Sequence, residues 1–400
     1  MNTNQKALVK ATVPVLKTNG TDLTKHFYTR MFTHNPELKN LFNMSHQASG
    51  KQQHALAGAV LAYAEHIENP QVLINVLQSI GNKHVSLNIS PEQYDIVGFH
   101  LISSIKEVLG EAADDELIEA WTQAYNELAQ IMISIEHELY ESALKKEGGW
   151  KGWRAFVIAD IVEESDEIKS FYLKPRDHQL IADYLPGQYI SIKTFIPELG
   201  HEQPRQYSLS SAFNPEYYRI SVKREKNGQN LPDGIVSNQL HQKKTGDELW
   251  VSAPAGVFYA HPESENPLVL ISGGIGATPL LSMLETRKNT LQNSTVVWLH
   301  SCRNEKVHAF KDHINHLNTD NHWLTTHIFY ETVDNHSDPV KKGRINLQEI
   351  RDEILIDNAK YYICGPEAFI KAQYNSLLQL GIAKEDILYE EFGPQLLHLN

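Results

Sequence analysis

The hydrophobic pattern of this 400-residue chain changes its period twice, and no other feature constrains the fold as strongly. Up to about residue 145, apolar side chains recur at the spacing of amphipathic helices. From Arg154 onward, short alternating runs separated by glycine and proline are typical of a small antiparallel barrel. From Pro267 onward, continuous apolar runs alternate with helical segments, which indicates a buried parallel sheet. We therefore predict a multidomain chain with an all-α domain, an antiparallel β-barrel and an α/β domain.

Several helix starts and ends can be located in the first region. Apolar spacing predicts helices over residues 8–16, 21–32 and 116–145. Ser90-Pro91-Glu92-Gln93 is a capping box with proline at the first helical position, so we expect a long helix to start there. The run of glycine and tryptophan over residues 148–153 ends the helical pattern. These boundaries predict three domains, over residues 1–147, 148–262 and 263–400.

The composition indicates a cytoplasmic protein with packed cores. Hydrophobic residues make up 41% of the chain and charged residues 21%, as in ordinary soluble domains. The formal net charge of −13 argues against nucleic acid or an anionic membrane as the main partner, because both require a basic face. The two cysteines cannot form a disulfide framework, and neither a signal-peptide pattern nor a transmembrane-length apolar run is found. We expect most of the 20 histidines to face solvent.

The run Arg205-Gln206-Tyr207-Ser208 predicts a flavin site in the barrel. It follows a strand-like run that begins Pro186-Gly187-Gln188-Tyr189. The arginine can pair with a pyrophosphate oxygen, the tyrosine can pack flat on an isoalloxazine ring, and the serine hydroxyl can donate to a polar edge of the flavin. A flavin site would make the chain a redox enzyme whose two ends supply an electron donor and an electron acceptor.

A glycine-rich turn in the third region predicts a nucleotide site. The run Gly273-Gly274-Ile275-Gly276-Ala277-Thr278-Pro279 leads from a strand into a helix, where bare backbone amides and the helix dipole can hold a pyrophosphate. A second apolar strand ends at Cys364-Gly365-Pro366. Two glycine turns at neighbouring strand ends can frame one crevice, with Cys364 near a nicotinamide ring. The simpler alternative for Cys364 is a buried structural thiol.

These motifs, in this order, resemble the ferredoxin-reductase-like flavoprotein superfamily, in which Phe392 would be an aromatic that covers the flavin. With a helical domain in front, the whole chain resembles a flavohemoglobin. The resemblance covers all 400 residues and implies a globin with heme b, an FAD barrel and an NAD(P)H domain. The implied activity is nitric oxide dioxygenation: electrons pass from NAD(P)H through FAD to the heme, and heme-bound dioxygen oxidises nitric oxide to nitrate. We expect a monomer.

His84 is the candidate for the heme ligand, because it ends an apolar helix. The resemblance implies that Tyr94 and Glu136 form a hydrogen-bond network with its imidazole and make the iron ligand more basic. Glu138 flanks the same apolar stripe, so periodicity alone does not choose between the two carboxylates. The resemblance favours Glu136, and both could instead be solvated charges on a helix.

The resemblance also implies a distal heme pocket. Three residues match its positions: Tyr28, Gln52 and Leu56. The Tyr28 hydroxyl can stabilise the partial negative charge of bound dioxygen. Phe42 matches a phenylalanine that wedges the heme, although any one of these residues taken alone would be ordinary core. Lys83 and Glu390 match a pair implied to bridge the globin and flavin domains and to tune electron transfer.

Further flavin contacts and the choice of nucleotide follow from the same comparison. Tyr189 matches a flavin-contacting tyrosine, and Val236-Ser237-Asn238 fits an FAD phosphate contact. Arg303 and Lys306 stand where a 2′-phosphate could be read, but no acidic ribose partner is unambiguous, so both NADH and NADPH remain open. The alternative functions are a heme-linked NAD(P)H reductase, an oxygen-sensing globin-reductase, or a reductase with a helical partner domain that binds no heme.

Overall fold

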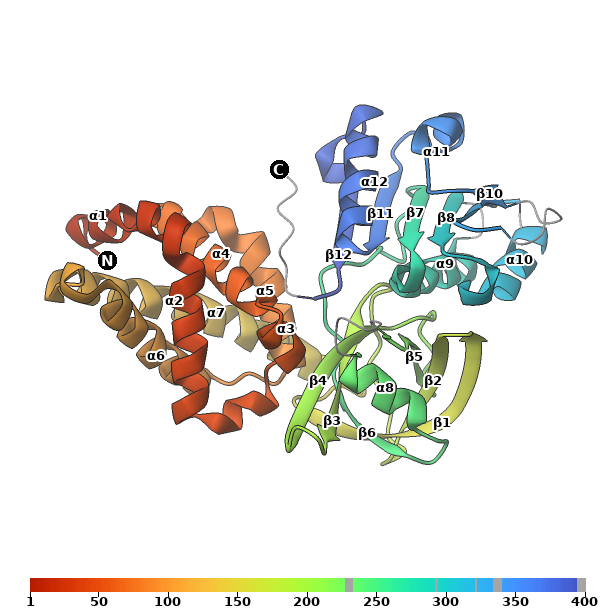
Figure 1. Ribbon diagram of the computed structural model, residues 1–400. Coiled ribbons are helices and arrows are strands. Elements are labelled where there is room, and N and C mark those ends of the chain that lie inside the picture. The colour runs from red at the N-terminus through yellow and green to blue at the C-terminus, as the bar shows by residue number, and fades with distance from the viewer. Residues whose placement is uncertain (227–232, 292–293, 321, 334–339, 394–400) are drawn as a thin grey trace. The chain divides into compact units, whose positions relative to one another are not determined.

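The computed structural model describes residues 1–226, 233–291, 294–320, 322–333 and 340–393 (Figure 1). The described chain forms two compact units. The first contains Met1–Trp153, Lys193–Arg205 and Gly393, and the second contains Arg154–Ile192 and the described part of Gln206–Phe392. Each unit is considered by itself below.

The first unit is helical, as predicted. Its helices bury an apolar core that includes Phe27, Met31, Ile105 and Trp121. No described helix is long and apolar enough to cross a membrane. The elements in chain order are α1 (Thr3–Ala11), α2 (Val13–His34), η1 (Pro36–Asn40), α3 (Met44–Ala48), α4 (Lys51–Glu65), η2 (Pro70–Leu73), α5 (Ile74–Ser86), α6 (Pro91–Leu109), η3 (Gly110–Ala112) and α7 (Asp115–Lys145).

Two helix boundaries near the N-terminus differ from the prediction. The helix expected over residues 8–16 is interrupted at Thr12, whose backbone N–H and Oγ1 both donate to the carbonyl of Val9. The next helix, α2, starts at Val13 and runs through Gly20 without a break, whereas the apolar spacing predicted a helix that begins at residue 21. The long helix expected from Ser90 is confirmed, and the Ser90 N–H donates to Gln93 Oε1 over 3.0 Å.

A six-stranded sheet forms the barrel part of the chain, with the strand order β4-β3-β6-β1-β2-β5. The pairs β1–β2 and β2–β5 are antiparallel, as predicted for this region. A short helix, α8 (Ile235–Gln242), precedes the last strand. The strands are β1 (Trp153–Ser165), β2 (Ile168–Pro175), β3 (Tyr189–Ile196), β4 (His201–Ser208), β5 (Tyr218–Lys223) and β6 (Glu248–Ser252).

The second sheet is parallel and has the order β10-β9-β8-β7-β11-β12. Strands β12, β11, β7 and β8 can be followed in this order in Figure 1. Alternate residues of its strands face opposite sides. Leu270 and Trp298 pack with α9 and α10, whereas Ile271 and Leu299 pack with α12. The strands are β7 (Leu268–Gly273), β8 (Val296–Cys302), β9 (Leu324–Tyr330), β10 (Lys341–Lys342), β11 (Lys360–Gly365) and β12 (Ile387–Glu391). The helices are η5 (Gly274–Gly276), α9 (Ala277–Thr290), η6 (Glu305–Val307), α10 (Lys311–Asp320), η7 (Leu347–Ile350), α11 (Arg351–Ile354), α12 (Glu367–Gln379) and η8 (Lys384–Asp386).

Two glycines let α7 approach its neighbours in the helical unit. A Cβ at Gly81 of α5 would lie 2.8 Å from Ile135 Cγ2 of α7. A Cβ at Gly98 of α6 would overlap the ring of Tyr125, and even Cδ1 of that ring would lie only 2.8 Å away. The absence of a side chain at these two positions therefore sets the distance between α7 and both helices.

We expect Gly98→Ala to destabilise the helical unit by about 1–3 kcal/mol, because the added methyl group forces the Tyr125 ring out of place. Urea unfolding followed by helical circular dichroism measures the change. Gly20→Ala is the matched control: its added Cβ would make only an ordinary contact, 3.5 Å from Ala57. Alanine in a helix interior should leave stability unchanged or raise it by up to about 1 kcal/mol. Equal effects of the two substitutions would contradict this account.

Candidate active site

Three predicted residues of the helical unit meet in one hydrogen-bond network. His84 Nδ1 lies 2.7 Å from Glu136 Oε1 and 3.0 Å from the Tyr94 hydroxyl. The Tyr94 hydroxyl donates to the same oxygen of Glu136. Burial and the negative charge of Glu136 raise the pKa of Tyr94 far above its usual range, so this hydroxyl stays protonated and remains a donor. Residues from α5, α6 and α7 thus converge on one carboxylate.

The structure separates the two carboxylates between which the sequence pattern could not choose. Glu136 is only 3% exposed and contacts His84, whereas Glu138 is exposed. An ionised carboxylate accepts hydrogen bonds only, so the short contact requires the ring proton on Nδ1. His84 Nε2 then keeps its lone pair for a metal ion, which is the arrangement found in histidine ligands with an outer carboxylate partner.

Side chains of α7 hold the α5–α6 corner on either side of Glu136. The Tyr125 hydroxyl donates to the carbonyl of Tyr94 over 2.5 Å. The Tyr140 hydroxyl donates to the carbonyl of Ile89 over 2.8 Å. Because Gly81 and His84 are three residues apart on α5, the close approach of α5 to α7 at Gly81 also brings His84 to the carboxylate.

The residues predicted for the distal pocket also lie together. Tyr28 is buried, and its ring centroid lies 5.7 Å from that of Phe42. Burial raises the pKa of Tyr28 well above its usual range, although the nearby Gln52 and Gln47 side chains oppose this rise. The hydroxyl therefore stays protonated and can donate a hydrogen bond. Leu56 packs against the same core, to which Phe42 also contributes.

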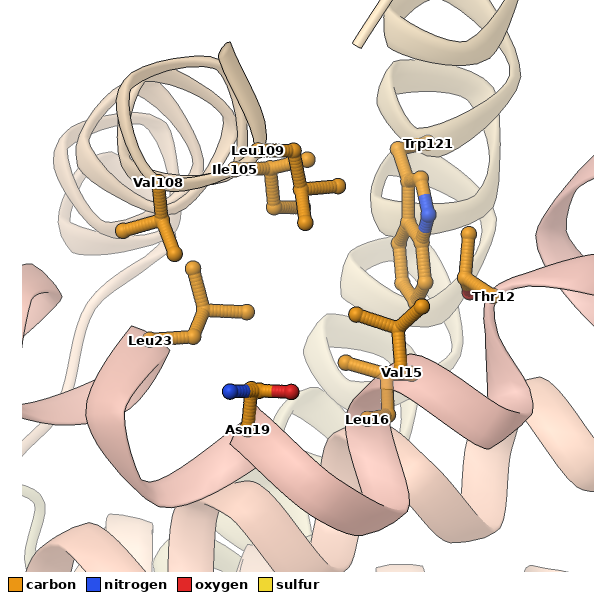
Figure 2. A pocket seen from close by; sticks show the side chains of 9 residues that line it. All are labelled: Thr12, Val15, Leu16, Asn19, Leu23, Ile105, Val108, Leu109 and Trp121. Atoms are coloured by element: carbon orange, nitrogen blue, oxygen red, sulfur yellow. The ribbon is translucent and has the colours of Figure 1, made fainter. Parts of the chain in front are cut away.

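A small apolar pocket in the helical unit lies among other residues (Figure 2). Its volume is ≈ 20 Å³, which is about the space that one water molecule needs. Side chains of α2, α6 and α7 line it together with Thr12: Val15, Leu16, Asn19, Leu23, Ile105, Val108, Leu109 and Trp121. None of the predicted site residues lines this pocket, so it gives no support to their assignment.

The predicted flavin residues lie on and beside β3 and β4. Ser208 is buried and Tyr207 half-buried. The Arg205 guanidinium donates to the carbonyl of Pro204 over 2.7 Å. The Gln206 amide donates to Ser191 Oγ over 3.4 Å. The Tyr189 ring fits closely against Gly256, where a Cβ would lie 2.9 Å from the ring.

The other predicted flavin and bridging residues have local partners. Asn238 Nδ2, in the first turn of α8, donates to the carbonyls of Glu225 and Gly234 over 2.9 and 2.8 Å. Ser237 Oγ donates to the Gly234 carbonyl over 3.0 Å, and Val236 is buried. Phe392 is exposed. Lys83 Nζ donates to the Gly393 carbonyl over 2.9 Å. Glu390 lies on β12 opposite Cys364 of β11.

The two glycine turns of the nucleotide region are neighbours, as expected. Strands β7 and β11 pair in parallel, with Ser272 opposite Cys364. A Cβ at Gly276 would overlap the Cys364 carbonyl, so only glycine allows the two turns to approach. At Gly274 the backbone has a φ of +55° and nothing within 4 Å of the Cβ position, which leaves its backbone accessible to a ligand. Burial raises the pKa of the Cys364 thiol far above its usual range, so this thiol stays neutral.

Sequence reasoning missed a pair of buried histidines beside this turn. His300 and His308 stack with ring centroids 4.6 Å apart, and both are almost fully buried. Ser272 Oγ donates to the Leu299 carbonyl and therefore accepts from His300 Nδ1, 2.8 Å away. His308 Nδ1 contacts the Tyr330 hydroxyl over 2.7 Å. The expectation that most histidines face solvent does not hold for these two, and the position of His300 directly after a continuous apolar run was the available signal.

Three family models match the chain in the predicted order. The Globin model matches residues 25–132, the Oxidoreductase FAD-binding domain model residues 155–259, and the Oxidoreductase NAD-binding domain model residues 270–375. The fold and these matches define a globin joined to flavin- and nucleotide-binding oxidoreductase domains, which confirms the predicted fold class.

Relatives of similar length identify the family. The Flavohemoproteins of Bordetella pertussis and Rhizobium meliloti are 50% and 49% identical to this chain, and each alignment covers at least 97% of both partners. The crystal structure of flavohemoglobin from Malassezia yamatoensis, with bound FAD and heme, matches 98% of this chain and 99% of its own with a TM-score of 0.86 and 28% identity. The chain therefore belongs to the flavohemoprotein family.

A second solved structure resembles the reductase part. It is the Flavohem-like-FAD/NAD binding domain of nitric oxide dioxygenase from Vibrio cholerae, which is 38% identical with a TM-score of 0.55. The match covers 60% of this chain and 99% of that one.

We expect stability to fall on acidification because of the buried histidine pair. Burial, with a smaller effect of the nearby Lys311 charge, lowers the pKa of His308 from 6.5 to about 4. The unfolded chain takes up this proton below about pH 6.5, but the folded chain does so only near pH 4. The free energy of unfolding should therefore decrease through this window by up to about 3 kcal/mol. The titratable rings at this place are His300, which stacks on His308, and Tyr330, which packs edge-on against His308.

Denaturant unfolding between pH 7 and pH 4.5 checks this expectation. His308→Gln can still hydrogen-bond to Tyr330 but cannot take up the proton, so its stability should depend less steeply on pH. Identical slopes for the variant and the wild type would show that His308 does not titrate on unfolding. His322→Gln, at an exposed position, is the matched control and should keep the wild-type slope.

Proposed function

We propose that this chain is a nitric oxide dioxygenase. NAD(P)H reduces FAD, electrons pass singly to heme b, and nitric oxide and dioxygen are converted to nitrate. One electron, one nitric oxide and one dioxygen give one nitrate ion, so each NAD(P)H supports the removal of two nitric oxide molecules. The observation that carries this proposal is that one chain combines a globin with both reductase domains and matches flavohemoproteins over almost its full length.

The chemistry of the donor set in the helical unit fits a heme. His84 Nε2 would bind the iron, while Glu136 and Tyr94 orient the imidazole through Nδ1 and increase its basicity. Heme b would supply an iron centre that binds dioxygen and accepts single electrons. Tyr28 would donate a hydrogen bond to the ligand on the distal side. The distal wall and heme contacts are assigned to Phe42, Gln52 and Leu56.

The reductase part contributes flavin and nucleotide contacts. The proposed FAD contacts are Tyr189, Arg205, Gln206, Tyr207, Ser208, Val236, Ser237, Asn238 and Phe392. The proposed NAD(P)H contacts are Gly273, Gly274, Ile275, Gly276, Ala277, Thr278, Pro279, Cys364, Gly365 and Pro366. The bare backbone at Gly274 and the position of Gly276 at a helix start support the second set.

We further propose that the enzyme is a cytoplasmic monomer of three domains, over residues 1–147, 148–262 and 263–400. Two observations support the location: both cysteines are free and buried, and none of the described helices could span a membrane. Lys83 and Glu390 are proposed to tune electron transfer to the heme. The tie from Lys83 to the carbonyl of Gly393 supports a role for this lysine near the C-terminal segment.

Anaerobic spectra and nitric oxide consumption test the proposed function together. The purified protein should show a heme absorption band, NADH should bleach the FAD band, and nitric oxide should be consumed with nitrate as the product. His84→Ala should lose the heme band and nitric oxide consumption while NADH still reduces FAD. The control His137→Ala removes an exposed histidine next to Glu136 and should behave like the wild type. A colourless helical domain, or a heme protein that yields no nitrate, would refute the proposal.

Tyr28→Phe should speed dioxygen release, since it removes one hydroxyl and keeps the buried ring. Loss of one hydrogen bond costs about 1–3 kcal/mol, which corresponds to a roughly five- to 150-fold faster release. Nitric oxide consumption should fall, while reduction of FAD by NADH stays normal. Stopped-flow dissociation of dioxygen from the fully heme-loaded variant measures the effect. An unchanged release rate would assign Tyr28 to the apolar core alone.

A further inference from the structure

Helix α9 is hydrogen-bonded to the loop that follows the proposed flavin motif. Ser282 Oγ donates to the carbonyl of Ser211 over 2.6 Å. The backbone N–H of Ala212 donates to Glu285 Oε2 over 2.9 Å. Ser282 and Glu285 are three residues apart and so share one face of α9. Ser211 and Ser282 are both buried, so water does not compete for the hydrogen bond between them.

Arg219 of β5 completes this connection. Its Nη2 donates to Glu285 Oε1 over 2.9 Å and also to the carbonyl of Ser210, and its Nε donates to Ser210 Oγ over 3.2 Å. The Arg219 and Glu285 side chains are only 12% and 15% exposed. Phe310 lies against the guanidinium, with its ring centroid 5.9 Å from Cζ. A buried ion pair is favourable only when its remaining donors and acceptors are also satisfied, and this one meets that condition.

A third contact joins α9 to the segment before Tyr189. A Cβ at Gly187 would lie 2.6 Å from Met283 Cε of α9 and 2.5 Å from the Phe258 carbonyl. Gly187 also has a φ of +110°, which side-chain-bearing residues rarely adopt. Helix α9 therefore abuts both segments that flank the proposed flavin contacts, Gly187 on one side and Ser210 to Ala212 on the other.

The same helix begins at the nucleotide turn. Glu285 follows Gly276 by nine residues, or about 13 Å along a helix. An α-helix is rigid over this length, so a shift at Glu285 also moves the turn at Gly276.

We propose that Arg219, Glu285 and Ser282 are positioning residues that hold the nicotinamide of bound NAD(P)H in the correct place relative to the flavin. This inference rests on the proposed function, in which a hydride would be transferred from C4 of the nicotinamide to N5 of the flavin. The transfer would oxidise NAD(P)H to NAD(P)⁺ and reduce the flavin.

Glu285→Gln is the most informative substitution. The carboxylate accepts at both oxygens, from Arg219 and His313 at Oε1 and from Ala212 at Oε2. An amide of the same size replaces one acceptor oxygen by an NH₂ group. One of these hydrogen bonds is then replaced by an unfavourable contact between two donors. Ser282→Ala removes the hydrogen bond to the Ser211 carbonyl and leaves the ion pair between Arg219 and Glu285 in place. It therefore tests the proposal even if Glu285→Gln fails to fold.

Single-turnover stopped-flow reduction of the FAD-loaded protein by NADH is the central measurement. We expect hydride transfer to slow about ten- to a hundredfold in Glu285→Gln and by a smaller factor in Ser282→Ala, because misplacement of reacting atoms is costly. Slower transfer from NADH deuterated at C4 would identify the hydride step. The dissociation constant for NAD⁺ should change less than twofold. In protein without FAD, the segment from Ser210 to Ala212 should exchange its amide hydrogens faster than in the wild type.

Glu216→Gln is the matched control. It makes the same change of charge in the β4–β5 connection that Glu285 contacts, at a side chain that is 73% exposed and forms an ion pair with Lys174 at the surface. It should reduce FAD at the wild-type rate. The positioning role is overturned if Glu285→Gln and Ser282→Ala reduce bound FAD as fast as the wild type, even where FAD content or thermal stability falls. Wild-type protein that NADH fails to reduce would instead refute the proposed function itself.

Discussion

The buried carboxylate of Glu136 is the constraint on which the helical unit depends. A buried charge is tolerated only when it is hydrogen-bonded, and His84 and Tyr94 supply donors to this one. They come from two other helices, so α5, α6 and α7 must meet at a single point. The glycines at positions 81 and 98 make that approach sterically possible. The packing of these three helices and the orientation of the His84 imidazole therefore depend on the same set of hydrogen bonds.

In the reductase part, a helix rather than a single carboxylate connects the segments that must lie close together. Helix α9 starts at a turn whose bare backbone suits a pyrophosphate, and its residues Ser282 and Glu285 contact the loop that follows the proposed flavin motif. The ion pair between Arg219 and Glu285 is buried, so its stability depends on the backbone groups of Ser210 and Ala212 that complete its hydrogen bonds. A pair of this kind fixes geometry more than it adds stability, because the cost of removing both charges from water offsets much of their attraction.

The interior of the nucleotide sheet contains ionisable side chains that stay uncharged. Burial lowers the pKa values of His300 and His308 and raises that of Cys364, so all three are neutral at physiological pH. His300 takes part in a hydrogen bond with Ser272, the residue immediately before the glycine turn. The hydrogen bond beside the glycine turn is therefore made by polar but uncharged side chains, and we expect protonation of the imidazoles in acid to weaken it.

Much of the architecture could be read from the chain itself, because burial imposes a period on the sequence. The change of period separated helical, barrel and parallel-sheet regions, and the capping box at Ser90 located the start of α6. Short motifs with local geometry, such as the turn at Gly273 to Gly276, were equally visible. Three contacts needed the tertiary structure: that of Glu136 with His84, the stacking of His300 on His308, and the pairing of Arg219 with Glu285. Periodicity alone did not separate Glu136 from Glu138. The hydrophobic period of a segment shows which side of that helix or strand is buried. It does not show which residue of a distant helix or strand packs against that side.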